Sequence, residues 1–208
     1  MLYFETVEPG TLSVLRQLME MPALQDFSLV GGTALSLRYG HRTSIDLDIF
    51  SHIPFENARV ATAMEDEFGE RFSFKTRNSG YGVFGFVDGI KVDIVRYPHP
   101  CITDTVVEGG IRMYTDADIA AMKIQAMLGR GKKKDFWDLH ELFKKYSLEQ
   151  VMTWHREKYP SQLLAISIPH ALTYFVDAED SEEPVSLRGQ TWEDIKRSVS
   201  RTVSDFLR

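Results

Sequence analysis

The residues of this chain that could do chemistry gather in one stretch, "SLVGGTALSLRYGHRTSIDLDIF" at residues 28–50. It holds a glycine pair followed by Thr33, and two carboxylates one residue apart, Asp46 and Asp48. Residues two apart in a strand point to the same face, with Cα atoms about 6–7 Å apart. Two carboxylates at that spacing can hold one hard cation through oxygen ligands. The stretch therefore predicts a metal site, although two aspartates on the exposed face of an edge strand would show the same spacing.

A third carboxylate, Asp93, lies in the middle of another expected strand, "KVDIV". Asp is disfavoured in strands, so its position there indicates a partner. If this strand lies beside "DLDIF", Asp46, Asp48 and Asp93 gather at one edge of the sheet as metal ligands. One or two Mg²⁺ ions held there would leave positions open for phosphate oxygens and would support an in-line phosphoryl displacement.

The glycine pair, Gly31 and Gly32, provides what carboxylates cannot, a site for an anion. Glycines let backbone amides approach a phosphate closely, Thr33 adds a hydroxyl donor, and the helix that follows presents its positive N-terminus. Arg38 and Arg42 flank the carboxylates, and we expect them to offset the negative charge or to contact phosphate. The combination of these features indicates nucleotide chemistry more specifically than any one alone.

Hydrophobic periodicity and turn residues predict the elements that must position these groups. Helices are expected at residues 11–21, 33–40 and 54–72, and strands at 27–32, 44–50, 71–77, 81–87 and 90–97, with Asp88-Gly89 as the hairpin turn between the last two. Beyond residue 115 the pattern is helical, with helices at 115–128, 134–146, 148–160, 161–175 and 191–207 and an acidic loop at 177–184. Thr115 and Asp118 form a variant capping box at the start of this half. The order predicts an α+β domain over residues 1–112 and a helical domain over residues 113–208.

Composition excludes several classes of protein. The 208 residues are 43% hydrophobic with a formal net charge of -6, which is typical of a globular protein whose overall field does not attract nucleic acid. The single cysteine, Cys101, excludes an internal disulfide, and no spacing indicates a zinc site. Because no long apolar segment or signal peptide is visible, we expect a cytoplasmic protein without membrane contact.

One basic run departs from this acidic balance, "GRGKKKDFW" at residues 129–137. It is either a solvated loop or, if it lies beside the acidic site, a surface on which Arg130 and Lys132 to Lys134 hold a triphosphate or an RNA backbone. The aromatic residues Phe136, Trp137 and Phe143 recur at helical spacing, which favours a place in the core over stacking on a base. His41 and His99 have no visible partner and are expected to be structural.

The pattern Gly-Gly-Ser/Thr, a gap, Asp-h-Asp and a later h-Asp-h, where h is hydrophobic, resembles the nucleotidyltransferases of the DNA polymerase β superfamily. Within it, "GGTALSLRYGHRTSIDLDIF" and "DIAAMKIQAMLGRGKKKDFWDL" resemble the AbiEii/AbiGii toxin family, to which the mycobacterial MenT toxins also belong. The resemblance spans roughly residues 28–143. It implies a polymerase-β-like mixed sheet with helices, an α-helical C-terminal half, and an NTP in the cleft between the two halves.

The resemblance also implies roles for individual residues. Asp46 and Asp48 would bind Mg²⁺, Asp93 would position or deprotonate the attacking hydroxyl, and Lys123 would contact the triphosphate. In "KDFWDL", Asp138 is the first choice for the essential acid, and Asp135, on the same helix face, is the alternative. The expected NTP-binding residues are Gly31, Gly32, Thr33, Arg38, Arg42, Arg130, Lys134 and Asp135.

The implied activity is Mg²⁺-dependent transfer of a nucleoside monophosphate from an NTP to an acceptor hydroxyl. Family members act as toxins of toxin–antitoxin or phage-abortive systems, so the implied partners are a tRNA or other RNA acceptor and a separate antitoxin. Three alternatives stay open: transfer to a small molecule such as an antibiotic, hydrolysis by the same carboxylates, and a catalytically silent nucleotide- or partner-binding module.

Overall fold

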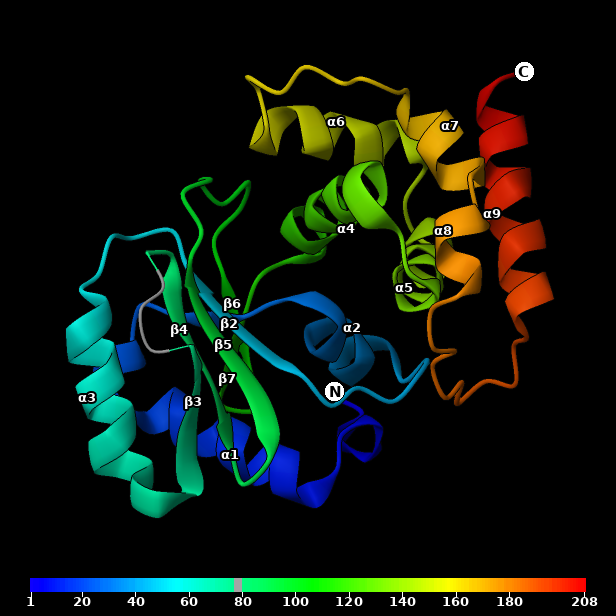
Figure 1. The fold of residues 1–208 in the computed structure, drawn as a ribbon. Coiled ribbons are helices and arrows are strands. Elements are labelled where there is room, and N and C mark those ends of the chain that lie inside the picture. The colour runs from blue at the N-terminus through cyan, green and yellow to red at the C-terminus, as the bar shows by residue number, and fades with distance from the viewer. Residues whose placement is uncertain (77–79) are drawn as a thin grey trace.

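The computed structural model describes residues 1–76 and 80–208, and in this part of the chain one mixed sheet packs beside a helical half (Figure 1). Its strands run in the order β3-β4-β5-β2-β1-β7-β6. The pairs β2–β5 and β1–β7 are parallel, whereas the other neighbours are antiparallel. The strands are β1 (Ser28–Leu29), β2 (Leu47–Ser51), β3 (Phe72–Thr76), β4 (Gly82–Val87), β5 (Ile90–Arg96), β6 (Val106–Glu108) and β7 (Ile111–Met113).

Helices cover the sheet and build the second half of the molecule. Helix α3 packs against β3 and β4, α1 contacts β7, and α2 contacts both β2 and the helices α4 and α5. In the helical half, α4 packs on α6, and α5 and α7 pack on α9. The helices are α1 (Pro9–Glu20), α2 (Gly31–Tyr39), α3 (Asn57–Phe68), α4 (Asp116–Arg130), α5 (Lys133–Phe143), α6 (Leu148–Lys158), α7 (Ile168–Thr173), α8 (Val176–Glu179) and α9 (Trp192–Phe206), with 3-10 turns at Phe4–Thr6, Pro22–Leu24 and Gly69–Arg71.

The predicted mixed α and β architecture is confirmed. The Asp-Gly hairpin forms between β4 and β5, where Asp88 and Gly89 both have positive φ, at 52° and 79°. Gly40 ends α2 in the left-handed conformation, with φ of 61°. The division of the chain between residues 112 and 113 stays a prediction, and β7 spans that position.

Several local predictions are wrong. Strand β2 begins at Leu47, so Asp46 lies just before the strand. Thr115 is the N-cap residue of α4, but its hydroxyl donates to Asp118 Oδ2 (3.3 Å) and does not cap the helix, and Asp118 also accepts from the backbone N–H of Ile102 and from Lys158. The helix expected at residues 161–175 is only α7, because Pro169 lies in its first turn and cannot continue a helix from before it. The acidic loop contains the short helix α8.

The remaining expectations concern the end of one strand, the aromatic residues of the helical half and membrane contact. Residue 77, the end of one expected strand, lies outside the described residues. Phe136 and Trp137 are buried and contact the ring of Trp192 on α9, which confirms their place in the core. No helix in the described residues is long and apolar enough to cross a membrane. The arrangement places the start of α2, the strands β2 and β5, and the helices α4 and α5 around one cleft.

Candidate active site

The cleft has a volume of about 710 Å³ and lies where the sheet meets the helical half. Its walls come from the start of α2, the segment 40–46 that joins α2 to β2 (the α2–β2 loop), strands β2, β3 and β5, and helices α4 and α5. The described residues that line it are Gly31, Gly32, Thr33, Arg42, Ser44, Asp46, Asp48, Lys75, Lys91, Lys123, Gln125, Ala126, Gly129, Arg130, Lys132, Lys134 and Asp135.

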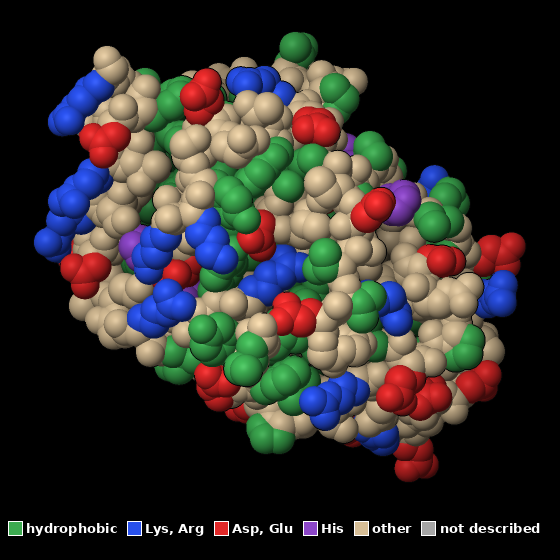
Figure 2. All heavy atoms as spheres, turned by 180° about the vertical axis from the view of Figure 1, so that it is seen from behind, with side chains coloured by type: hydrophobic (Ala, Val, Ile, Leu, Met, Phe, Trp, Pro, Cys, Tyr) green, Lys and Arg blue, Asp and Glu red, His purple; other side chains and the backbone are tan. Residues whose placement is uncertain are grey.

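Positive charge is concentrated in this cleft. Among the described lining residues, seven are lysine or arginine and three are aspartate, although the whole chain has a formal charge of -6. Figure 2 shows lysine and arginine side chains interspersed with acidic ones across the middle of one face. A concave surface with one dominant sign of charge raises the local concentration of oppositely charged ligands. The cleft therefore suits a polyanion such as a triphosphate.

Two glycines shape the floor of the cleft. Gly31 has φ of 71°, and a Cβ there would lie 3.0 Å from Oδ2 of Asp48. A Cβ on Gly32 would clash with Nη2 of Arg42. The backbone amide of Val30 donates to the carbonyl of Asp48 (2.9 Å), which fixes the turn against β2. The first turn of α2 thus presents backbone to the cleft close to a carboxylate, as an anion site requires.

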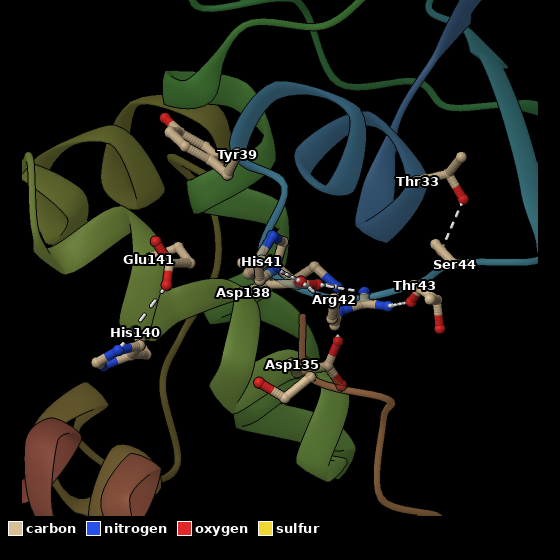
Figure 3. Close-up of polar contacts among 12 residues, drawn as sticks. Thr33, Tyr39, His41, Arg42, Thr43, Ser44, Asp135, Asp138, His140 and Glu141 are labelled. Carbon is tan, nitrogen blue, oxygen red and sulfur yellow. Dashed lines mark hydrogen bonds and ion pairs between the residues drawn. The ribbon is translucent and has the colours of Figure 1, made fainter. Parts of the chain in front are cut away.

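Thr33 has a different contact from the one expected. Its hydroxyl lies 2.8 Å from Oγ of Ser44 and donates to the carbonyl of Asp46, and its side chain is buried. Figure 3 shows the contact between Thr33 and Ser44. Thr33 therefore ties the α2–β2 loop to α2, and its hydroxyl is already engaged within the protein.

The carboxylates lie on neighbouring parallel strands. Asp48 on β2 is directly opposite Asp93 on β5, so the condition under which the sequence brings these carboxylates together is met. Burial raises the pKa of Asp48; Lys91 opposes this rise, and the nearby charges of Asp93 and Asp46 add to it. Charge neutralisation at this edge would therefore stabilise the ionised form of Asp48.

Lysines currently neutralise the other two acids. Nζ of Lys134 lies 3.2 Å from Oδ2 of Asp46, and Nζ of Lys91 lies 2.5 Å from Oδ2 of Asp93. The Oδ1 atom of Asp93 is buried and has no hydrogen-bond partner within the described residues. No group of three or more acidic, histidine or cysteine residues there could hold a metal by itself, so the expected three-carboxylate cluster is not found.

An ionic network lies beneath the opposite wall (Figure 3). Asp138 is fully buried, and its two oxygens accept from Nε2 of His41 (2.8 Å) and from Nε and Nη2 of Arg42 (2.8 and 2.9 Å). Nζ of Lys123 lies 2.6 Å from Oδ2 of Asp138 and 2.8 Å from Oδ1 of Asp135. One carboxylate thus anchors both Arg42 and Lys123, which line the cleft.

This network keeps its members charged. Burial alone would lower the pKa of Lys123, but Asp135 and Asp138 outweigh it and raise the value above its usual range. Burial alone would raise the pKa of Asp138, but Arg42, Lys123 and the hydrogen bonds from His41 and Arg42 hold it well below its usual range. The lysine amine and the arginine are therefore permanent cations at neutral pH.

Asp135 and Asp138 differ in where they lie. Asp135 lines the cleft and also accepts from the backbone N–H of Lys132 (3.2 Å), whereas Asp138 lies beneath the wall, out of reach of a ligand. Asp138, the first choice for the essential acid, thus meets the cleft only through the side chains of Arg42 and Lys123. Of these two acids, Asp135 is the one that lines the cleft, and its carboxylate pairs with the amine of Lys123.

Arg38, expected at the NTP site, lies elsewhere. Its guanidinium pairs with Asp116 (3.0 Å) and donates to the carbonyl of Tyr114, and it is not among the residues that line the cleft. Arg38 is in the last turn of α2, so it faces α4, whereas Arg42 follows the helix and turns inward. In the described part of the chain, Arg38 therefore lies outside the cleft lining, and its expected contact with NTP has no support from this geometry.

The basic run divides between two surfaces. Arg130, Lys132 and Lys134 line the cleft, whereas Lys133 donates through its backbone N–H to Ser181 (2.9 Å) and through its amine to the Glu179 carbonyl (3.0 Å). His99 packs against the rings of Tyr97 and Tyr159, away from the cleft lining. His41 has the partner that the sequence did not reveal, Asp138.

Sequence reasoning missed part of the lining, namely Ser44, Lys75, Lys91, Gln125, Ala126 and Gly129. Lys91 carried a usable signal, because it is two residues from Asp93 in a strand and so shares its face. Gln125, Ala126 and Gly129 lie on the helix that bears Lys123, but no residue type among them indicates a site. Lys75 comes from β3, whose place in the sheet the sequence does not reveal.

Comparisons with known proteins agree with this geometry. The family model for the nucleotidyl transferase AbiEii toxin of the type IV TA system matches residues 13–205. An uncharacterized protein from Aquifex aeolicus is 32% identical over 199 residues, which cover 93% of this chain and 94% of that protein. The match to the family model extends well beyond the residues that carry the sequence motifs.

Two known structures share the fold at low identity. MenT4, a nucleotidyltransferase toxin from Mycobacterium tuberculosis, aligns with a TM-score of 0.60 at 16% identity, over 93% of this chain and 82% of that chain. The antibiotic-resistance factor ANT(2'')-Ia aligns with a TM-score of 0.54 at 16% identity, over 74% of this chain and 96% of that chain. With the family model covering nearly the whole chain, this protein belongs to the AbiEii nucleotidyltransferase toxin family and is a nucleotidyltransferase.

Proposed function

We propose that this enzyme transfers a nucleoside monophosphate from a Mg²⁺-bound NTP to a hydroxyl of an RNA acceptor. The observation that carries the proposal is the meeting of three features in one cleft: the helix N-terminus at Gly31, the carboxylates Asp46 and Asp48, and the buried cation Lys123. A triphosphate needs backbone amides and cations, and phosphoryl transfer needs a metal next to them.

Magnesium fits the donor set. Mg²⁺ in nucleotide enzymes is bound by one or two carboxylates, with the remaining positions taken by water and substrate phosphates, so Asp46 and Asp48 suffice. Oδ1 of Asp93, opposite Asp48, is buried and has no hydrogen-bond partner in the described part of the chain, so a cation nearby would stabilise it. When bound, the metal would neutralise phosphate oxygens and favour displacement of pyrophosphate.

The protein's own groups would do the rest. Lys123 and Arg42, fixed by Asp138, would hold the phosphates, and Arg130, Lys132 and Lys134 would add positive charge at the mouth of the cleft. Asp93, paired with Lys91, lies beside Asp48, where it could orient the attacking hydroxyl. Transfer then needs a hydroxyl opposite the leaving pyrophosphate.

An RNA acceptor and a toxin role rest on the family, whose members include toxins of type IV toxin–antitoxin systems. In such a system the toxin acts with a cognate antitoxin, so we include one among the proposed partners. The basic cleft of an otherwise acidic chain supports a polyanionic acceptor such as tRNA. The likeness to ANT(2'')-Ia favours a second candidate, transfer to a small molecule.

The test is transfer of label from each α-³²P NTP to total cellular RNA in the presence of Mg²⁺. Asp46→Asn and Asp48→Asn are expected to abolish labelling while remaining folded, and Asp66→Asn on the exposed face of α3 serves as the matched control. Label on a tRNA-sized band supports the proposal. Release of free nucleotide would indicate hydrolysis, and binding without turnover on any acceptor would indicate a silent module.

A further inference from the structure

A C-terminal segment, residues 185–190, lies against the α2–β2 loop, and we call this segment the strap. The backbone N–H of Thr43 donates to the carbonyl of Val185 (3.0 Å), and the N–H of Leu187 donates to the carbonyl of His41 (2.9 Å). Between these two bonds, Arg42 and Ser186 form an isolated antiparallel β-bridge. About 145 residues separate the two segments in the sequence, yet they pair like neighbouring strands, as the orange segment beside α2 shows in Figure 1.

Arg188 fixes the strap to two helices. Its Nη1 lies 2.8 Å from Oε2 of Glu141 on α5, and its Nη2 donates to the carbonyl of Tyr39, the last residue of α2. Glu141 is 3% exposed, so this ion pair is largely shielded from solvent on the acid's side. Gln190 also donates to Glu141 (3.4 Å). A single guanidinium thus joins the strap to α2, which precedes the α2–β2 loop, and to α5, the helix that carries Asp138.

The residues just before the strap contact the first residue of α5, next to the basic wall of the cleft. Just before the strap, Ser181 accepts from the backbone N–H of Lys133 (2.9 Å), and the carbonyl of Glu179 accepts from its amine (3.0 Å). Lys133 is the first residue of α5, the helix that carries Asp135 and Asp138. Residues 179–190 therefore contact both the α2–β2 loop, which bears Arg42, and helix α5, whose Asp138 anchors Arg42.

The supported loop holds groups at the cleft. Arg42 reaches Asp138 with two hydrogen bonds and lies against Gly32, and the loop then leads through Ser44, bonded to Thr33, to Asp46. On the side away from the cleft, the backbone of this loop is held by the strap. If the strap is released, the carbonyl of His41 and the N–H of Thr43, on either side of Arg42, lose their backbone partners, while the side-chain bonds of His41 and Arg42 to Asp138 remain.

We propose that the strap is a positioning element for nucleotidyl transfer and that Arg188 is the positioning residue that locks it. The proposal rests on the function proposed above. Small misplacements of groups that orient a substrate reduce the rate by up to about a hundredfold. Among the described residues, the hydrogen bonds and the ion pair of the strap go to Tyr39, His41, Thr43 and Glu141, none of which lines the cleft. Its loss therefore changes geometry and leaves the charged side chains of the lining in place.

The first test compares two substitutions at one position. Leu187→Pro deletes the N–H that donates to His41, whereas Leu187→Ala keeps it and removes a side chain that is 44% exposed. We expect Leu187→Pro to lower kcat/KM at least about tenfold and to accelerate hydrogen exchange of the Thr43 amide. Leu187→Ala is expected to match the parent in both.

The second test uses Arg188. Arg188→Ala removes both anchors, whereas Arg188→Lys can reach Glu141 or the Tyr39 carbonyl but not both, so we expect the lysine variant to fall between alanine and parent. Arg197→Ala, which breaks an exposed pair with Asp194 on α9, is the control and is expected to behave as the parent. If Leu187→Pro fails to fold, the Arg188 variants and their control test the proposal.

The outcomes separate the strap from the proposed function. Faster Thr43 exchange with unchanged kcat and KM, or unchanged exchange in both Leu187→Pro and Arg188→Ala, would overturn the strap proposal. If the parent transfers no nucleotide to any acceptor, the proposed function fails, and the strap is then judged by the affinity for Mg²⁺-ATP, Mg²⁺-GTP, Mg²⁺-CTP and Mg²⁺-UTP. An affinity that the strap variants leave unaltered would also overturn it.

Discussion

Replacing Asp138 by asparagine tests the ionic network directly. The carboxylate accepts from four donor atoms: Nε2 of His41, Nε and Nη2 of Arg42, and Nζ of Lys123. Asparagine keeps one acceptor oxygen and turns the other into an NH₂ donor, which would face donors on Arg42 and Lys123 or on His41 and Arg42. The substitution preserves shape, removes one charge and deprives buried Arg42 of the carboxylate with which it pairs, while Lys123 keeps its ion pair with Asp135.

The expected loss of stability is large. Asp138 is fully buried and the side chain of Arg42 is 4% exposed, so solvent screens the pair little. Removing one partner of a buried ion pair costs about 3–5 kcal/mol. In a chain of this size, each kcal/mol shifts Tm by about 2–4 °C, which gives a decrease of roughly 6–20 °C. The variant Asp205→Asn, whose exposed pair with Arg208 is worth about 0–1 kcal/mol, is the control.

Urea unfolding at several pH values checks this prediction. The folded pKa of Asp138 lies below the unfolded value of about 3.9, so its contribution is fully present above about pH 4 and is lost as the pH falls through the folded pKa. The difference between parent and Asp138→Asn should therefore be constant from neutral pH down to about pH 4 and shrink below it. A difference under about 1 kcal/mol at pH 7 would refute the network as the anchor of Arg42 and Lys123.

Three further predictions concern other parts of the molecule. Gly32→Ala should lower transfer of labelled nucleotide at least about tenfold because its Cβ would displace Arg42, whereas Gly10→Ala, on α1 and outside the cleft lining, would meet only Ile90 at 4.0 Å and should not. Lys134→Gln should raise KM for NTP several-fold and reduce the dependence of KM on KCl concentration, since a half-exposed cation is screened by salt. Burial and then Arg156 lower the pKa of His155 below its unfolded value of about 6.5, so the parent should lose stability as pH falls below about 6.5, and His155→Gln should lose less between urea titrations at about pH 7.5 and 5.5.

Local features of the fold could be predicted, but the pairing of strands could not. The Asp88-Gly89 turn and the end of α2 at Gly40 depend on the φ preferences of a few adjacent residues. The placement of β5 beside β2 depends on segments more than 40 residues apart, and the sequence offered it only as a condition. The length of α7 was overestimated because the apolar residues before Ile168 remain exposed in the structure, so periodicity alone did not indicate burial.

In the candidate site, too, local spacing could be predicted from the sequence, but contacts between distant segments could not. Spacing placed Asp135 and Asp138 on one helix face, but which of these two buried acids lines the cleft depends on the α2–β2 loop, whose Arg42 pairs with Asp138. Arg38 and Arg42 are four residues apart, and only the end of α2 between them sends one toward Asp116 and the other into the cleft. The strap had no motif, because its pairing with the α2–β2 loop uses backbone groups, which any sequence carries, and the partner of Arg188 is distant in the sequence.

The buried ionic network is better explained by function than by stability. Replacing a buried ion pair with apolar residues is often neutral or stabilising, so a chain selected for stability alone would have little reason to bury Arg42, Lys123 and Asp138 together. Their shared geometry does something that apolar residues cannot, because it holds two permanent cations at fixed positions on the wall of a cleft in a chain with net charge -6. Fixed cations stabilise developing charge without reorganising during the reaction. Burying Asp138 therefore lowers the stability of the folded state, whereas the fixed cations stabilise charge once a triphosphate enters the cleft.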